Sequence, residues 1–201
     1  QLYYSKIFKC DYGIVLNIAD DHLTWHKDFD DYCESKTKLF DMLKENGKGY
    51  CHESIKERGR KEVVEHIKSL NNIEFFGINE ENDIILKGET INFKSFASNL
   101  SKLDRNKKVL LENYPPLVDI CVKYGFDNDE IVNLLNNFKL EPFRLNEVKI
   151  NNNLFVNDSK STNIHTTIFA VKNYPYSIVI LGGDDKHLNY EEFICGDRKS
   201  T

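Results

Sequence analysis

The stretch Gly13-Ile14-Val15-Leu16-Asn17-Ile18 decides the fold class of this chain, because a short apolar run rich in β-branched residues predicts a buried strand. Polar residues follow it at Asp20-Asp21-His22. Residues 28–45 then carry apolar side chains at the spacing of an amphipathic helix. A strand that leads into a helix is the repeating unit of α/β folds, so we expect the chain to build one.

This alternation continues along most of the chain. The pattern predicts strands at residues 49–51 and 73–76, a hairpin over 82–96 that turns at Lys87-Gly88-Glu89, and helices over 55–70, 110–124 and 129–138. Pro115-Pro116 would open or interrupt the second of these helices, and Asp127 or Asn128 would cap the third. We therefore predict an α/β fold with a mostly parallel sheet and flanking helices.

A domain boundary is predicted at Leu140-Glu141-Pro142, which divides the chain into residues 1–140 and 141–201. Beyond the boundary, the pattern predicts a hairpin with strands at 147–150 and 154–156 and a helix over 162–171. The run 177–181 is fully apolar and predicts one more buried strand.

The composition excludes several classes of protein. With 40% hydrophobic and 29% charged residues, the 201-residue chain is expected to fold rather than stay disordered. A net charge of -5 argues against a general nucleic-acid binder, and no run of about 18 apolar residues predicts a membrane span. The five cysteines are spread out without a CxxC pair, which favours reduced thiols in a cytoplasm over disulfides or a zinc site.

Polar clusters follow three of the predicted strands, and open α/β sheets bind ligands at the carboxyl ends of their strands. The first cluster is Asn17-Ile18-Ala19-Asp20-Asp21-His22, followed by His26, where His22 could give a nitrogen ligand to a divalent cation and Asp21 could orient it. The alternative is a pair of helix-capping aspartates beside a surface histidine.

The second cluster, residues 157–163, lies between a predicted strand and a helix, where backbone amides and hydroxyls favour an anion. Lys160 would add a cation and Asp158 an acceptor for a sugar hydroxyl; the alternative is an ordinary capping turn. The third cluster is Gly182-Gly183-Asp184-Asp185-Lys186, whose lysine could pair with a carboxylate or phosphate, although glycine turns after strands are common. Arg144, at the predicted boundary, could reach an interdomain cleft or be a surface cation.

No GxxxxGK[ST] loop occurs in the chain, so it is not expected to cradle a triphosphate in the P-loop manner by itself. The chain also opens on Gln1-Leu2 without an initiator methionine. We therefore expect it to be a piece of a longer polypeptide.

Taken together and in this order, the clusters resemble the Mur ligase superfamily, and within it the members that add D-glutamate. Residues 17–36 are similar to the family's Asn-x-x-x-Asp-His…His…Phe…Tyr…Lys pattern. The other segments that carry the resemblance are Gln1-Leu2, Pro142-Phe143-Arg144-Leu145, Asn157-Asp158-Ser159-Lys160-Ser161-Thr162-Asn163 and Leu181-Gly182-Gly183-Asp184-Asp185-Lys186. The Asn-Asp-Ser-Lys sequence points to the D-glutamate-adding branch rather than to its sister ligases.

The resemblance implies that residues 1–140 are the C-terminal part of a central ATP-binding domain without its P-loop. Residues 141–201 would be the start of a Rossmann-like C-terminal domain. The parent protein would be an ATP-dependent carbon–nitrogen ligase that adds D-glutamate to UDP-N-acetylmuramoyl-L-alanine through an acyl phosphate. This reaction belongs to peptidoglycan synthesis, and so to cell wall biogenesis, cell shape and cell division. The resemblance implies a cytoplasmic monomer, with this chain inactive alone.

The resemblance also implies roles for individual residues. His22 and a carbamylated Lys36 would hold Mg²⁺, and Lys36, Arg144 and Lys160 would be catalytic. ATP would contact Asn113, Arg144, Asp158 and Lys160, and D-glutamate would contact Thr162 and Lys186. The sequence departs from the family pattern at Phe143, where the family has histidine, and at Val109-Leu110, where it has His-Asn.

Two other functions stay open at this point. The chain could be a non-catalytic ligand-binding or regulatory module that keeps the fold, which the missing P-loop and the changed residues 109–110 favour. It could also belong to a related folylpolyglutamate-type amino-acid ligase, against which Asp158-Ser159-Lys160 argues.

Overall fold

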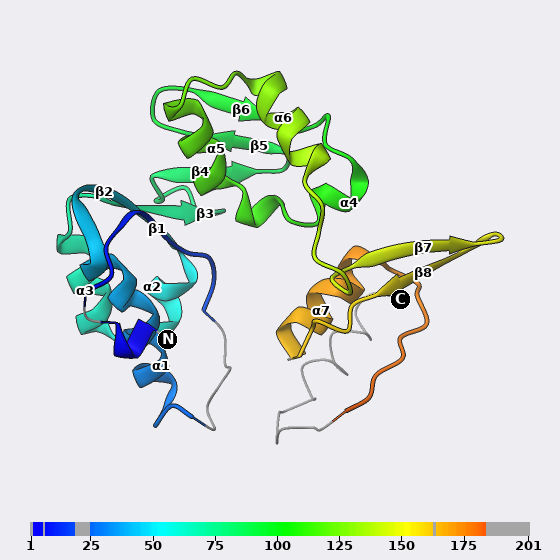
Figure 1. The fold of residues 1–201 in the computed structure, drawn as a ribbon, viewed down its shortest axis with the longest axis horizontal. Coiled ribbons are helices and arrows are strands. Elements are labelled where there is room, and N and C mark those ends of the chain that lie inside the picture. Colours follow the sequence, from blue (N-terminus) through cyan, green and yellow to red (C-terminus); the bar gives the residue numbers. More distant parts are fainter. Residues whose placement is uncertain (1, 6, 19–24, 163, 184–201) are drawn as a thin grey trace. The chain divides into compact units, whose positions relative to one another are not determined.

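Strands of the first of two units form a six-stranded sheet in the order β1-β2-β3-β4-β5-β6 (Figure 1). The computed structural model describes residues 2–5, 7–18, 25–162 and 164–183, and the units are Gln1–Asn137 and Phe138–Thr201. Neighbouring strands are parallel from β1 to β4 and antiparallel from β4 to β6. The strands are β1 (Cys10–Val15), β2 (Leu43–His52), β3 (Ile73–Gly77), β4 (Ile84–Lys87), β5 (Thr90–Asn92) and β6 (Ala97–Asn99). The prediction of an α/β fold with a mostly parallel sheet is confirmed.

Helices cover both faces of this sheet. Tyr50 of β2 belongs to one core cluster together with Val118 and Ile131, whereas the next residue, Cys51, belongs to a second cluster together with Tyr32 and Ile67. This alternation follows from the strand's pleat, which sends successive side chains to opposite faces. The helices are α1 (Phe29–Thr37), α2 (Ser54–Arg58), α3 (Lys61–Ser69), α4 (Arg105–Lys108), α5 (Pro115–Lys123) and α6 (Asn128–Asn137), with 3₁₀ turns η1 (Leu2–Tyr4), η2 (Lys38–Met42) and η3 (Leu111–Asn113).

Three of the predicted helices are shorter in the structure, and the one expected over 110–124 begins only at Pro115, after the 3₁₀ turn η3. The helix expected over 28–45 ends at Thr37, and β2 already begins at Leu43, because Leu43 pairs with Cys10 of β1 and this tertiary pairing overrides the helical periodicity. The helix expected over 55–70 is broken between α2 and α3. Gly59, at the break, is extended, and a Cβ there would lie 2.7 Å from the carbonyl oxygen of Ile55.

Other local predictions are confirmed. The turn between β4 and β5 contains Gly88 at a φ of 57°, a conformation that favours glycine. Helix α5 begins at Pro115, where a missing N–H costs nothing. Asp127 accepts the N–H of Glu130 at 2.9 Å and Glu130 accepts that of Asp127 at 2.8 Å, a capping box at the start of α6. Strand β6 was not predicted.

The second unit contains the antiparallel hairpin β7 (Asn146–Ile150) and β8 (Asn153–Asn157), followed by α7 (Ile164–Asn173). The hairpin and the helix were predicted. The hydroxyl of Tyr174 donates to Glu147 Oε1 at 2.8 Å and ties the end of α7 to the hairpin.

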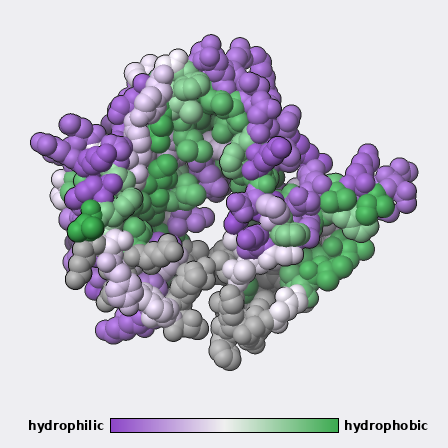
Figure 2. Space-filling model, in the orientation of Figure 1, coloured by the Kyte–Doolittle hydropathy of each residue, from purple (hydrophilic) through white to green (hydrophobic). Residues whose placement is uncertain are grey.

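The strand predicted over 177–181 is not formed within the described residues. Ile178 is 95% exposed and Ile180 is 93% exposed. Figure 2 shows that hydrophobic residues reach the surface of the molecule among hydrophilic ones. A strand needs a partner for its backbone hydrogen bonds, and the described part of this unit pairs β7 only with β8. In the same described ranges, no helix has the length and apolar character that a membrane span needs.

Candidate functional site

The carboxyl ends of β1, β2 and β3 lie at one edge of the first unit's sheet, because these strands are parallel. They end at Val15, His52 and Gly77. Ligands of open α/β sheets bind at such an edge, so these strand ends are the first place to look for chemistry.

Ser54 connects two of these strand ends. Its Oγ accepts the backbone N–H of Ile18 at 3.1 Å and lies 3.0 Å from Nδ1 of His52. The backbone N–H of Ser54 also donates to that Nδ1, at 3.2 Å. Burial lowers the pKa of His52 below its ordinary value, and the opposing charges of nearby glutamates do not reverse the shift. His52 is therefore neutral at pH 7.

Glu53 binds the backbone that directly follows β3. Its carboxylate accepts the backbone N–H groups of Ile78 and Asn79, each at 3.0 Å, and the amide of Asn82. Burial alone would raise the pKa of Glu53, but these hydrogen bonds outweigh it and the pKa falls below the ordinary value. A side chain at Gly77 would collide with this carboxylate, so glycine is required there.

Lys36 lies in the last turn of α1, with its side chain exposed and its Nζ 5.2 Å from the centre of the Tyr32 ring. Tyr32 packs in the same core cluster as Ile18. The structure therefore puts Lys36 on a helix that packs at the end of β1. His22, the other predicted metal ligand, lies outside the described residues.

Asn113 is half-buried at the end of η3. The charge of its neighbour Glu112 acts on His52, so η3 lies near the end of β2. Within the ranges that the structure describes, the Asn113 side chain makes no hydrogen bond.

In the second unit, two predicted segments are joined to each other. The backbone N–H of Lys160 donates to the carbonyl oxygen of Phe143 at 3.0 Å, and that of Leu145 donates to Asp158 Oδ1 at 3.0 Å. The side chains of Arg144 and Lys160 are both exposed beside these bonds. The structure thus brings two predicted catalytic cations into one loop cluster.

The loop around Arg144 is strained. Phe143 and Leu145 have φ values of 65° and 46°, and each such non-glycine residue costs on the order of 1 kcal/mol. Asp158 holds the loop in place, because it binds Leu145 and also accepts the hydroxyl of Ser161. Sequence reasoning gave Asp158 a ligand-binding role and missed this structural one.

Thr162 and Lys186 are the two residues predicted to bind the amino-acid substrate. Thr162 is exposed just before α7, and Lys186 lies outside the described residues. Among the described residues, no group of three or more histidine, cysteine, aspartate or glutamate side chains could hold a metal ion.

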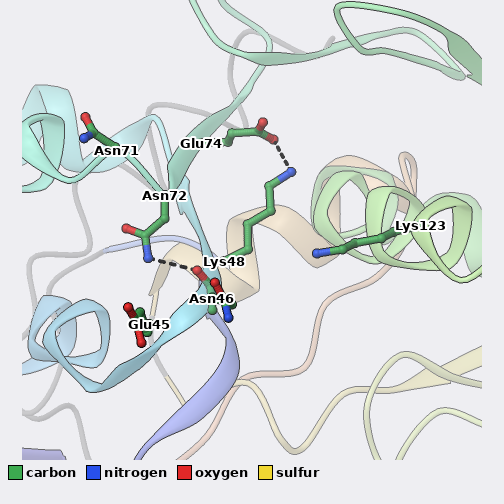
Figure 3. Close-up of a pocket in the computed structure, with 8 residues that line it drawn as sticks. Glu45, Asn46, Lys48, Asn71, Asn72, Glu74 and Lys123 are labelled. Carbon is green, nitrogen blue, oxygen red and sulfur yellow. Dashed lines mark hydrogen bonds and ion pairs between the residues drawn. The ribbon is translucent and has the colours of Figure 1, made fainter.

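A pocket of about 330 Å³ lies at the opposite edge of the first unit's sheet, at the start of β3 (Figure 3). Its Lys48 is held between Glu74 at 3.0 Å and Asp119 at 2.7 Å, and the buried Tyr50 hydroxyl donates to Asp119 at 2.6 Å. Burial alone would lower the pKa of Lys48, but its hydrogen bonds to the two carboxylates raise it. The pocket is lined by Glu45, Asn46, Gly47, Lys48, Asn71, Asn72, Glu74 and Lys123, none of which was a predicted site residue.

Comparison with known proteins adds to this geometry. A family model described as the Mur ligase middle domain matches residues 1–113. The UDP-N-acetylmuramoylalanine–D-glutamate ligase of Pseudothermotoga lettingae is 30% identical over 97% of this chain and 44% of its own length. The ligase of the same name from Buchnera aphidicola subsp. Schizaphis graminum is 31% identical over 94% of this chain and 44% of its own length. The chain therefore spans less than half the length of these relatives.

Solved structures show the same fold. MurF ligase from Thermotoga maritima in complex with ADP is similar with a TM-score of 0.58 at 23% identity, over 82% of this chain and 40% of that one. MurF from Acinetobacter baumannii is similar with a TM-score of 0.60 at 19% identity, over 81% of this chain and 37% of that one. At these identities the likeness establishes the fold, and the substrate has to be argued from sequence and site.

Proposed function

The chain belongs to the Mur ligase family, whose members are ATP-dependent amide ligases, and we propose that it is part of a ligase that adds D-glutamate to UDP-N-acetylmuramoyl-L-alanine. The units would be the C-terminal part of the central ATP-binding domain and the start of a Rossmann-like C-terminal domain. The parent protein would act in the cytoplasm, in peptidoglycan synthesis.

The observation that carries this proposal is the similarity to D-glutamate ligases across both units, at 30% identity over 97% of the chain. The loop cluster of the second unit supports it, because Arg144 and Lys160 present two cations from segments that hydrogen bonds join. Such cations stabilise the negative charge that develops on a transferred phosphoryl group and on the tetrahedral oxygens of the following acyl transfer.

In this reaction ATP would phosphorylate the terminal carboxylate of UDP-N-acetylmuramoyl-L-alanine, and the amine of D-glutamate would displace the phosphate. Arg144 and Lys160 would contact the phosphates, Asp158 the ribose and Asn113 the nucleotide. Thr162 and Lys186 would bind the carboxylates of D-glutamate. Each assignment follows the family's motif onto the matching residue of this chain.

Magnesium is the metal that the family implies. A protonated Lys36 would repel it, whereas a carbamate on Lys36 would offer oxygen ligands, which Mg²⁺ prefers. Lys36 is exposed on a helix that packs at the end of β1, so its amine is accessible to this modification. His22 and carbamylated Lys36 would hold the ion, which would neutralise charge on the phosphate oxygens.

Phosphate release by the full-length protein tests the proposal. With ATP, Mg²⁺ and bicarbonate, we expect release that requires both UDP-N-acetylmuramoyl-L-alanine and D-glutamate. Release with D-alanyl-D-alanine and the corresponding tripeptide nucleotide, but not with D-glutamate, would overturn the choice of substrate. Binding of ADP or D-glutamate without any release would favour a non-catalytic module.

A further inference from the structure

At the carboxyl ends of β1 and β2, the backbone pairing of the two strands is supplemented by the side chains of His52 and Ser54, which none of the family motifs quoted above includes. Ser54 is the first residue of α2, and its Oγ accepts the N–H of Ile18, a residue that is 2% exposed. The same Oγ lies 3.0 Å from His52 Nδ1. We call Ile18, His52 and Ser54 the strand-end bridge.

Two groups of Ser54, its backbone N–H and its Oγ, lie within hydrogen-bond distance of His52 Nδ1. The backbone N–H of Ser54 donates to His52 Nδ1 at 3.2 Å, so Nδ1 carries a lone pair and the ring proton is on Nε2. The Ser54 Oγ, which accepts the N–H of Ile18, lies 3.0 Å from the same nitrogen. The neutral histidine thus orients the serine, and the serine holds the backbone of Ile18.

The surroundings favour this neutral histidine. The rings of His52 and Phe76, on neighbouring strands, pack edge to face with their centres 5.2 Å apart. The negative charges that act on His52 are those of Glu53, Glu57 and Glu112, and burial outweighs them. At neutral pH the bridge is therefore intact.

We propose that Ser54 and His52 are positioning residues of the ligase, because they fix the backbone at Ile18, directly before the segment that carries His22. This inference rests on the proposed function. After β1 the chain continues through Leu16 and Asn17 to Ile18, the last residue of the described range 7–18. The hydrogen bond from the Ile18 N–H to Ser54 Oγ holds the backbone at this point. Loss of such a restraint misplaces reacting groups, and misplacement by about 1 Å costs on the order of 100-fold in rate.

A purely structural role for Ser54 would give a different pattern of effects, and the chain offers a matched control. Ser98 is 2% exposed, and its hydroxyl donates to Asn128 Oδ1 at 2.7 Å. It lies on β6, at the other end of the sheet order from β1. The substitution Ser98→Ala removes a buried hydroxyl from the same unit and leaves the strand-end bridge unchanged.

The experiment uses the full-length ligase with Ser54→Ala, Ser54→Thr, His52→Asn and Ser98→Ala. Amide hydrogen exchange of the peptide that contains Ile18 and the kinetics of ligation are measured on each. We expect Ser54→Ala to speed exchange in that peptide and to lower kcat about 10-fold or more. Threonine keeps the hydroxyl and asparagine puts an acceptor near the place of Nδ1, so both should stay within about threefold of wild type.

The control decides between the two roles. Ser98→Ala should lower the melting temperature as much as Ser54→Ala but leave kcat and the exchange at Ile18 unchanged. Equal kinetics for the two alanine variants, or unchanged exchange at Ile18 in Ser54→Ala, would overturn the positioning role. A wild-type protein that exchanges slowly at Ile18 but does not ligate would instead overturn the proposed function, and the positioning role with it.

Discussion

The backbone N–H of Lys160 donates to the carbonyl oxygen of Phe143 at 3.0 Å, which joins two motifs that are distant in the sequence. Both residues border the loop that presents Arg144, and Asp158 secures the same loop through Leu145. The loop cluster of the second unit therefore depends on hydrogen bonds at its base, while its two cations stay exposed.

Replacing Asp158 should release the Arg144 loop. Because Phe143 and Leu145 are held at positive φ, the loop should relax once Leu145 loses its acceptor. We expect Asp158→Ala to reduce ligation about 100-fold, and Asp158→Asn, which keeps one acceptor oxygen, to reduce it less. Steady-state kinetics on the full-length protein would show this. Lys149→Ala, an exposed change on β7, is the control and should leave the rate unchanged; equal rates for all three variants would contradict the loop's dependence on Asp158.

Lys36 should be needed as a carbamate and not as a cation. Lys36→Arg keeps the positive charge but cannot form the carbamate, so we expect about a 100-fold loss of phosphate release. The melting temperature should not change, because the side chain is exposed. ¹³C NMR with labelled bicarbonate should show a carbamate signal in wild type that is absent from the arginine variant. Full activity of Lys36→Arg would exclude the metal-ligand role.

Stability should fall in acid in two separate windows. The pKa of His52 is lowered from its ordinary 6.5, so its contribution is complete above pH 6.5 and is lost as the pH falls below that value. The pKa of Glu53 is lowered from 4.5, so its contribution is complete above pH 4.5 and is lost at lower pH. The free energy of unfolding should be measured by urea denaturation from pH 8 to pH 3. We expect His52→Asn to reduce its pH dependence in the upper window and Glu53→Gln to reduce it in the lower one. A profile with neither window changed would show that these groups do not couple folding to pH.

The Lys48 network should stabilise the first unit. Asp119→Ala leaves the buried Tyr50 hydroxyl without its acceptor and removes one of the two carboxylates beside Lys48. We expect a loss of about 2–3 kcal/mol in the free energy of unfolding, measured by urea denaturation. As a control, Lys102→Ala breaks the ion pair between Lys102 and Asp129, two side chains that are each more than 70% exposed. We expect this change to lower the free energy of unfolding by less than about 1 kcal/mol. Equal losses for both variants would mean that the network contributes no more than a surface ion pair.

Several elements could be predicted from the sequence because their signals are local. The capping box of Asp127 and Glu130, the helix start at Pro115 and the glycine turn at Gly88 each depend on residues within one turn of each other. The mostly parallel sheet followed from apolar runs that alternate with helical patterns. The roles proposed for the residues of the candidate site rest on the order of the motifs in the sequence.

Other features depend on contacts between distant residues, and only the tertiary structure decided them. Leu43 begins a strand because Cys10 lies beside it, against the helical periodicity of its own segment. The apolar run 177–181 forms no strand in the described part of the chain, because a strand exists only with a partner. The sequence likewise did not predict that Asp158 supports the Arg144 loop or that Ser54 joins two strand ends. Hydrogen bonds between residues distant in the sequence leave no periodic pattern in it. The sequence by itself thus determined the fold class and the types of residue at the candidate site, and the tertiary structure decided how those residues are held.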